Sequence, residues 1–227
     1  MISTDKTAQS LAEQSTNRSA VPDRSHYAGD YAGKWRIHSF AHQIETSLEL
    51  KPKTILEIGV GAGVVAAALK AVGIQVTTLD IEPSLKPSII GSVTHIPFQD
   101  HCFDVGLCCQ VLEHLPFDMF HSALRELNRV TKVGLVLSLP DATREYHISA
   151  QLPIIHRRNV SLTIGRLRPP QLTESYFKLT GHFWEIGTEK TPLTVVKQHI
   201  VSSGWRIART WRLPEMTWHR FFELKPA

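Results

Sequence analysis

The sequence predicts an α/β fold, a doubly wound sheet of mostly parallel strands, and three observations carry this prediction. The first is the run 54–58, which is apolar without alternation and therefore suits a strand buried on both faces. The second is the group of three glycines that follows it, and the third is the alanine-rich stretch 64–72, which predicts a helix. A strand, a glycine turn and a helix in this order are typical of a nucleotide-binding crevice.

The remaining elements follow the same reasoning in chain order. Before the first strand, the segment 37–49 predicts a helix. After it, β-branched or apolar runs predict strands at 75–79, 88–93, 103–109 and 134–139, and Asp118 is expected to cap a helix with apolar positions at Phe120, Leu124 and Leu127.

The segment 141–191 has too little periodicity for an assignment. Beyond it, residues 194–203 predict a helix that Gly204 ends, and two β-rich runs at 205–213 and 218–224 predict a closing pair of strands.

Gly59, Gly61 and Gly63 allow a sharp turn and a close approach of the backbone to a ligand. The helix that follows directs its N-terminal amides and its dipole toward the same place. A dinucleotide fingerprint requires G-x-G-x-x-G, but here the third glycine comes one residue early and Val64 takes the last position. Glu57, ahead of the first glycine, would repel a pyrophosphate and attract a cationic ligand.

With this spacing, Glu57 and the three glycines match the motif E-x-G-x-G-x-G, and the chain resembles the class I S-adenosylmethionine-dependent methyltransferases, in their small-molecule branch with a methyltransferase type 11 domain. Segments 92–98, 103–116 and 124–130 are similar to further blocks of that family. The resemblance covers about residues 53–140. It implies a Rossmann-like fold with an antiparallel last strand, a cap insertion after the fifth strand at 141–191, and S-adenosylmethionine as the cofactor.

Asp80 ends the second strand, where an acid can accept hydrogen bonds from both ribose hydroxyls of an adenosine. The resemblance places the adenine ring near Ser92, where the family often has an acid, and makes Gln110 a cofactor contact. The expected cofactor-binding residues are Glu57, Gly59, Gly61, Gly63, Asp80, Ile81, Ser92, Val93 and Gln110.

Methyl transfer from a sulfonium needs positioning above all, and a base only where the acceptor must lose a proton. His114, beyond the fourth strand, is the first candidate base, with the alternative that Glu113 and His114 brace the next helix. His182 is the second candidate, with Trp184 and Glu185 as expected substrate contacts, and the alternative there is a packed corner of the cap.

Two other histidines, His147 and His156, are expected to be structural or at the surface. Ubiquinone-pathway O-methyltransferases resemble the fourth-strand segment and bind a divalent metal through Glu-x-x-Glu-His. In this chain Gln110 replaces the first acid, so no metal site is expected.

The 227 residues suffice for one domain, with 42% hydrophobic residues and no apolar run near the ~20 residues that span a bilayer. Residues 1–26 are expected to form a disordered polar tail and 27–227 the domain, and the resemblance implies that 27–50 is a helical lid. Within the lid, Tyr31 or Trp35 either closes over the methionine end of the cofactor or docks the segment. Three cysteines without C-x-x-C spacing indicate reduced thiols in a cytoplasmic protein.

The net charge of +4 is unevenly distributed along the chain. Residues 141–227 carry 13 Lys plus Arg and 7 Asp plus Glu, which gives a net charge of +6. The first 140 residues carry 12 Lys plus Arg and 14 Asp plus Glu, which gives −2. This favours an anionic acceptor or simply a solvated basic face. No basic run with interleaved aromatics indicates nucleic acid.

Three functions follow from these observations. The leading one is a methyltransferase acting on an O or N atom of a small molecule, such as a sugar, a cell-envelope or a natural-product intermediate. The second is a non-catalytic cofactor-binding partner protein of the same fold. The third, a nucleotide-dependent oxidoreductase, is disfavoured by the early third glycine.

Overall fold

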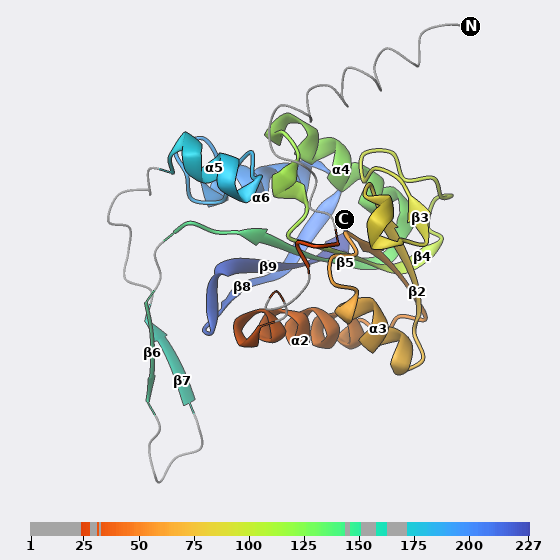
Figure 1. Cartoon of the computed structure of the whole chain (residues 1–227), viewed down its shortest axis with the longest axis horizontal. Helices are drawn as coiled ribbons and strands as arrows, with labels where there is room; N and C mark the ends of the chain where they lie inside the picture. The colour runs from red at the N-terminus through yellow and green to blue at the C-terminus, as the bar shows by residue number, and fades with distance from the viewer. Residues whose placement is uncertain (1–23, 28–30, 32, 144–145, 151–157, 163–171) are drawn as a thin grey trace, which may run out of the picture.

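The computed structural model describes residues 24–27, 31, 33–143, 146–150, 158–162 and 172–227, with backbone alone for 146–150 and 158–162. Almost all of the predicted tail and much of the predicted cap lie outside these residues. The described part contains a seven-stranded sheet with the order β3-β2-β1-β4-β5-β9-β8 and a separate hairpin of β6 and β7 (Figure 1).

The strands of the main sheet are β1 (Thr54–Ile58), β2 (Gln75–Asp80), β3 (Ile89–Ile90), β4 (Phe103–Cys109), β5 (Thr131–Pro140), β8 (Trp205–Leu213) and β9 (Met216–Pro226). Strands β1 to β5 pair in parallel, whereas β9 pairs antiparallel with both β5 and β8. The last strand alone therefore runs against the others, as predicted.

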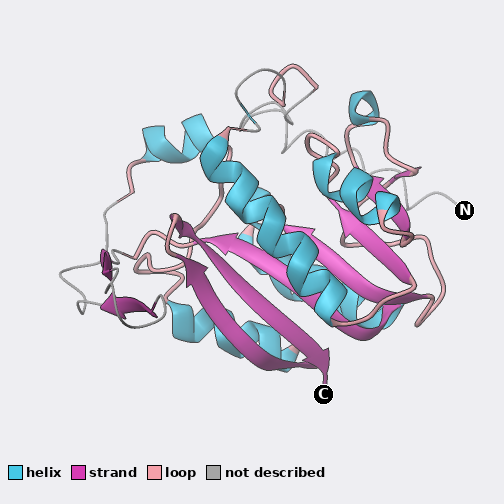
Figure 2. Ribbon diagram, turned by 90° about the horizontal axis from the view of Figure 1, so that it is seen from below, coloured by secondary structure: helices cyan, strands magenta, loops and turns pink. Residues whose placement is uncertain are grey.

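Helices cover both faces of the sheet (Figures 1 and 2). On one face lie α2 (Lys34–Glu49) and α3 (Val64–Ala71), and on the other lie α4 (Phe117–Val130) and α6 (Leu193–Ser202). Two core clusters result, because neighbouring residues of a strand point to opposite faces: Ile55 packs in the α2 and α3 layer and Leu56 in the α4 and α6 layer.

The segment after β5 contains β6 (Tyr146–Ala150), β7 (Arg158–Leu162) and the short helix α5 (Glu174–Thr180), which Gly181 ends in a left-handed conformation. The chain returns to the body of the fold at Ile186, which forms a parallel bridge with Asp141 just beyond β5. The segment thus leaves and rejoins the domain at neighbouring points.

Two details differ from the predicted elements. Helix α4 begins at Phe117 after Pro116 without a side-chain cap, so Asp118 lies in the first turn and does not cap the helix. Its negative charge still interacts favourably with the helix dipole there. The strand expected over 88–93 is reduced to Ile89–Ile90, because the chain turns away at Ser92, whose backbone bridges His95.

No helix among the described residues combines the length and the apolar character needed to cross a bilayer. The three cysteines are free thiols.

Candidate active site

The glycine loop between β1 and α3 forms one wall of a pocket. Gly59, Gly61 and Gly63 have φ angles of 82°, 51° and 72°, a region that side chains disfavour. Gly59 also lies against Val111, since a Cβ atom on it would be 2.5 Å from Val111 Cγ2. Helix α3 begins directly after Gly63 without a side-chain cap, so its first amides remain available to a ligand.

Four further parts of the chain complete the pocket: the region from Tyr27 to the first turns of α2, the end of β1, the end of β4, and His219 on β9. The ends of β1 and β4 meet because the two strands are parallel neighbours. The lining residues used below are Tyr31, Arg36, Glu57, Gln110, Val111 and His219, together with the glycine loop.

Glu57 lies at the inner end of the pocket and is only 5% exposed. Its Oε2 atom has no hydrogen-bond partner within the described residues. Burial raises the pKa of this carboxyl to about 8. A buried acid with an unpaired oxygen beside a pocket suits a ligand that brings a positive charge and N–H donors.

Arg36, on α2, brings a positive charge to the same pocket and was not found by the sequence analysis. Its guanidinium lies 4.1 Å from the ring centroid of Tyr31, which also lines the pocket. No carboxylate within the described residues forms a salt bridge with it. Trp35, in contrast, is 56% exposed, so Tyr31 is the aromatic of the predicted pair that reaches the pocket.

Asp80 ends β2 close to the glycine loop. One carboxylate oxygen accepts a hydrogen bond from the Val60 amide at 2.8 Å and the other accepts one from the Glu82 amide at 3.0 Å. Each oxygen keeps a further lone pair for a hydroxyl donor. The carboxylate therefore fixes the loop and keeps the acceptor capacity that ribose requires.

The residues predicted around the adenine lie further from the pocket lining. Ile81 is 54% exposed, and the Ser92 hydroxyl is bonded to Thr94 Oγ1 at 2.9 Å. Val93 is 5% exposed and belongs to the core cluster beneath the sheet, so its side chain is not free to contact a ligand.

Gln110 follows β4 with a φ of 56°, an uncommon conformation for a residue with a side chain. Its Nε2 atom donates to Ser138 Oγ at 3.2 Å, and its backbone amide donates to the Ser138 carbonyl at 2.9 Å. These bonds hold the strained turn against β5 and keep Gln110 at the pocket wall.

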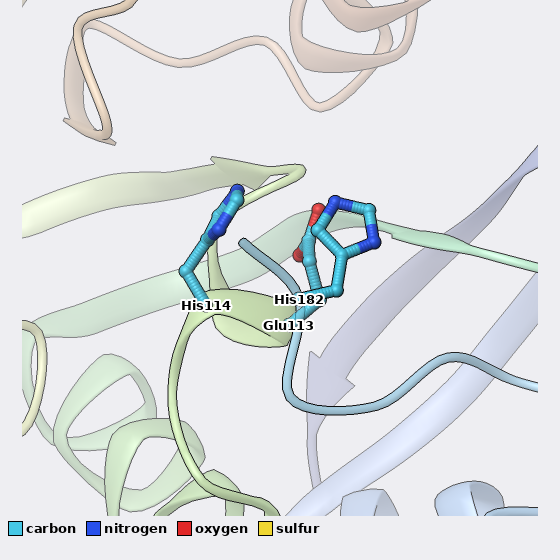
Figure 3. A group of neighbouring side chains, drawn as sticks. All are labelled: Glu113, His114 and His182. Carbon is cyan, nitrogen blue, oxygen red and sulfur yellow. The ribbon is translucent and has the colours of Figure 1, made fainter. Parts of the chain in front are cut away.

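A second group of polar side chains follows Gln110 and Val111 in the chain. Glu113, His114 and His182 offer donor atoms that all lie within 4.8 Å of one another (Figure 3). Glu113 is fully buried, neither of its oxygens has a partner within the described residues, and burial raises the pKa of its carboxyl to about 7. Figure 3 shows the carboxylate between the two imidazole rings.

Each of the two imidazoles is held by its Nδ1 atom. His114 Nδ1 donates to the Gly181 carbonyl at 3.1 Å, and His182 Nδ1 lies 2.7 Å from Glu185 Oε1, which also accepts a bond from the Tyr176 hydroxyl at 2.8 Å. Burial lowers the pKa of His114 to about 4, so its ring is neutral at neutral pH. Among the described residues, Nε2 of neither ring has a hydrogen-bond partner, so this atom can make other contacts.

Trp184 does not face this cluster. It is 4% exposed, packs edge-on against Phe117 and Phe120 with ring centroids 4.9 Å apart, and donates its indole N–H to the Leu115 carbonyl at 3.1 Å. This arrangement favours the alternative of a packed corner for Trp184. Glu185 is buried and oriented toward His182, which gives it a positioning role.

The structure thus brings the predicted His114, His182 and Glu185 together, although 67 residues separate His114 from its partner Gly181. His147 has no described side chain, and His156 lies outside the described residues. Sequence analysis missed Arg36 and the part played by Glu113. A signal for Glu113 was present, since it follows Leu112 and precedes His114 shortly after an apolar strand, and a glutamate in such an apolar stretch is seldom fully buried without a function.

Comparison with known proteins agrees with this geometry. Residues 56–139 match a family model described as a methyltransferase domain. The chain therefore carries a methyltransferase domain over these residues. No curated protein sequence matches the chain significantly.

Solved structures share the fold of this methyltransferase at low sequence identity. The 1,6-didemethyltoxoflavin N1-methyltransferase of Burkholderia thailandensis, with 1,6-didemethyltoxoflavin and S-adenosylhomocysteine bound, superposes with a TM-score of 0.58 at 13% identity, over 100% of this chain and 91% of that one. An N-methyltransferase of Bradyrhizobium japonicum, in complex with S-adenosylhomocysteine, gives 0.58 at 12% identity over 94% and 97%. The magnesium protoporphyrin IX methyltransferase of Synechocystis, with the same bound product, gives 0.54 at 14% over 97% and 95%.

S-adenosylmethionine fits the residues of the pocket. It carries an ammonium, a carboxylate and a sulfonium on one side and an adenosine on the other. The unpaired oxygen of Glu57 suits the ammonium, Arg36 suits the carboxylate, and the glycine loop leaves room for close backbone approach. Asp80 keeps lone pairs for the ribose.

Proposed function

We propose that this methyltransferase methylates an O or N atom of a small-molecule acceptor that binds beside His114 and His182. The observation that carries the proposal is the pair of imidazoles, which Gly181 and Glu185 hold through Nδ1, while Nε2 of each ring has no hydrogen-bond partner among the described residues. The two imidazoles are the polar groups that an acceptor approaching the methyl group would meet.

In this class of reaction, most of the catalysis comes from holding the acceptor atom and the methyl group in the correct relative position. Transfer of a methyl group from a sulfonium to a nucleophile is an in-line displacement, in which the new bond forms as the carbon–sulfur bond breaks and that bond pair stays on sulfur. Orientation alone supplies roughly 7–11 kcal/mol in favourable cases. The protein therefore has to hold the cofactor in the pocket and the acceptor atom opposite the sulfonium.

His114 and His182 serve the remaining need, which is the acceptor's proton. In each ring the Nδ1 hydrogen bond fixes the tautomer, so Nε2 is the acceptor atom of the imidazole. An O–H or N–H group of the substrate can donate to it as its nucleophilic lone pair attacks the methyl carbon. Glu185, held in turn by Tyr176, keeps the His182 ring in place.

The acceptor itself is proposed by class alone. The cationic excess of residues 141–227 supports an anionic metabolite, such as a phosphorylated or carboxylated sugar or natural-product intermediate. Free thiols at Cys102, Cys108 and Cys109 support a reducing, cytoplasmic location.

Calorimetric titration with S-adenosylmethionine and S-adenosylhomocysteine, with NADH as the control ligand, is the first test. Binding of the two sulfur compounds near the micromolar range, about −8 kcal/mol, with no heat from NADH, is the expected result. An acceptor panel with radiolabelled cofactor then identifies the substrate class. Absence of binding by both sulfur compounds would contradict the proposal at its first step.

The roles of the histidines are tested once an acceptor is known. His114→Ala and His182→Ala should keep the cofactor affinity and lower turnover by roughly 10²–10⁴-fold. His101→Gln is the matched control, because that ring bonds the Thr131 carbonyl outside the pocket. Wild-type turnover in both alanine variants would remove the imidazoles from the mechanism.

A further inference from the structure

We propose that Glu113, His114 and His182 together bind a divalent transition metal ion, of which Zn²⁺ is the typical example. The sequence analysis expected no metal, because Gln110 stands where an acid would complete a site for a hard cation. The structure assigns a different set of ligands, with the third one supplied by the segment after α5. The proposal rests on the proposed function only for the role of the ion toward the acceptor: with the ion bound, both Nε2 atoms are its ligands, and the ion replaces them as the group that contacts the acceptor.

The three donor groups converge without any rearrangement of the backbone. Their donor atoms lie within 4.8 Å of one another (Figure 3), and the ring centroids of His114 and His182 are 5.0 Å apart. Zinc lies about 2.0–2.2 Å from nitrogen and oxygen donors, so its ligands are roughly 3–4 Å from each other. Small side-chain rotations therefore bring the three donors to bonding distance.

Glu113 provides an independent reason to expect a cation. Its side chain is fully buried, and neither carboxylate oxygen has a hydrogen-bond partner within the described residues. Leaving a buried carboxyl without a partner costs stability, because its hydration is lost and nothing replaces it. A metal ion at the centre of the cluster would satisfy both the charge and the lone pairs of this group.

The outer contacts of the imidazoles agree with the same assignment. Metal-bound histidines nearly always donate their second ring nitrogen to a carbonyl or a carboxylate, which fixes the ring and raises its basicity. His114 Nδ1 donates to the Gly181 carbonyl, and His182 Nδ1 faces the Glu185 carboxylate. Both rings thus have the outer partner that a metal ligand needs, and both keep Nε2 free.

The ligand chemistry selects the class of ion. Two imidazoles and one carboxylate suit Zn²⁺, Co²⁺ and related ions, whereas Mg²⁺ and Ca²⁺ prefer oxygen donors throughout. Gln110 is not a fourth ligand, because its side-chain amide is bonded to Ser138. Three protein ligands leave a position of the ion open, which is typical of zinc ions that bind a substrate or a water molecule. An acceptor oxygen or nitrogen next to the cofactor pocket would take that position.

Metal binding is measured directly on the full chain, without a histidine tag and after dialysis against a chelator. Titration with Zn²⁺ should show one tight site per chain, and Co²⁺ should give the visible absorption band of a low-symmetry, nitrogen- and oxygen-ligated ion. Mg²⁺ should not compete. Absence of a stoichiometric Zn²⁺ site, or binding that Mg²⁺ displaces, would overturn the proposal.

Variants locate the site. Glu113→Gln and His182→Gln should each remove the tight site, and Glu185→Gln, which only loosens the His182 ring, should weaken binding about 10- to 100-fold. His101→Gln should bind Zn²⁺ as the wild type does. If Glu113→Gln or His182→Gln is unstable, the Co²⁺ spectrum of Glu185→Gln tests the proposal by itself. If His182 is a ligand, this spectrum must differ from that of the wild type. Unchanged Zn²⁺ affinity and spectrum in that variant would exclude the assignment.

These measurements are separate from the test of methyl transfer. Cofactor binding without a metal site would overturn the inference and leave the proposed function intact. A metal site without cofactor binding would support the inference and overturn the proposed function. Once an acceptor is known, activity that a chelator removes and Zn²⁺ restores shows that the imidazoles act through the ion, and activity indifferent to a chelator shows that they act directly.

Discussion

His219 Nδ1 lies 3.0 Å from Ser39 Oγ, which joins the antiparallel strand β9 to helix α2 at the side of the cofactor pocket. The histidine is 3% exposed, and burial lowers the pKa of its imidazole to about 3, with the nearby charges of Arg36 and His182 acting in the same direction. The link between α2 and the sheet therefore depends on an uncharged ring.

This neutral ring makes the free energy of unfolding depend on pH. Between an unfolded pKa of 6.5 and the folded value of about 3, only the unfolded state binds the proton, so stability falls as pH falls through this window. The loss reaches up to about 1.4 kcal/mol per pH unit. In urea titrations from pH 6.5 to 4.5, His219→Gln should show a shallower dependence than the wild type.

Ser39→Ala is the matched control, because it removes the hydrogen bond and leaves the burial of His219 in place. It should keep the steep pH dependence of the wild type. Parallel dependences of stability on pH for the wild type and His219→Gln would mean that folding does not lower the pKa of His219.

Cofactor binding should release a proton from Glu57. The carboxyl has a pKa of about 8 before the cofactor binds, so it is mostly protonated at pH 6.5, and pairing with the ammonium of the cofactor favours its ionised form. Calorimetry at pH 6.5 in buffers of different ionisation enthalpy should report about one proton released per cofactor. Glu57→Gln should bind more weakly and release none, whereas equal proton release by both proteins would assign the proton elsewhere.

Arg36→Gln should weaken S-adenosylmethionine binding by about 10- to 150-fold, which is the loss of one charged hydrogen-bonded contact of roughly 1.5–3 kcal/mol. The guanidinium lines the pocket and lacks a carboxylate partner among the described residues, so nothing else replaces this contact. Arg206→Gln, at an exposed position of β8, is the control. Calorimetric affinities for the three proteins check the prediction, and an unchanged affinity for Arg36→Gln would refute it.

Gly59→Ala should damage both the loop and the pocket. The new methyl group would lie 2.5 Å from Val111 Cγ2, and the φ of 82° adds strain of about 1–2 kcal/mol. Gly73→Ala carries the same kind of strain, with a φ of 91°, but meets nothing within 4 Å. Urea unfolding should show a lower free energy of unfolding for both variants, and the larger decrease for Gly59→Ala. Calorimetry should show that Gly59→Ala alone fails to bind the cofactor.

The sequence predicted the parallel part of the fold closely, because each of its elements carries a local signal. β1 and β4 begin and end at the predicted residues, and α3 follows the glycine loop as expected. The antiparallel position of β9 came from the resemblance, and the structure confirms it. The start of α4 was predicted two residues late, because Pro116 is the N-cap residue while Asp118 provides only a favourable charge in the first turn.

The sequence predicted the parts of the site that one short segment forms. It did not predict the parts that form when segments distant in sequence pack together. The glycines and Asp80 lie close in sequence, so their spacing was informative. Arg36 reaches the pocket only because α2 packs across β4 and β9, which no local pattern encodes. The burial of Glu113 likewise depends on a loop that returns about 70 residues later.

The bridge between Asp141 and Ile186 closes the segment between them into a loop with fixed ends. Asp141 strengthens this closure through bonds to Arg220 and to the Thr143 backbone and hydroxyl. Because the entropy of closing a loop grows slowly, a doubling of its length costs only about 0.6 kcal/mol. A change in the length of the segment 142–180 therefore adds little to the free energy of closing it, and the glycine loop between β1 and α3 keeps its place when that length changes.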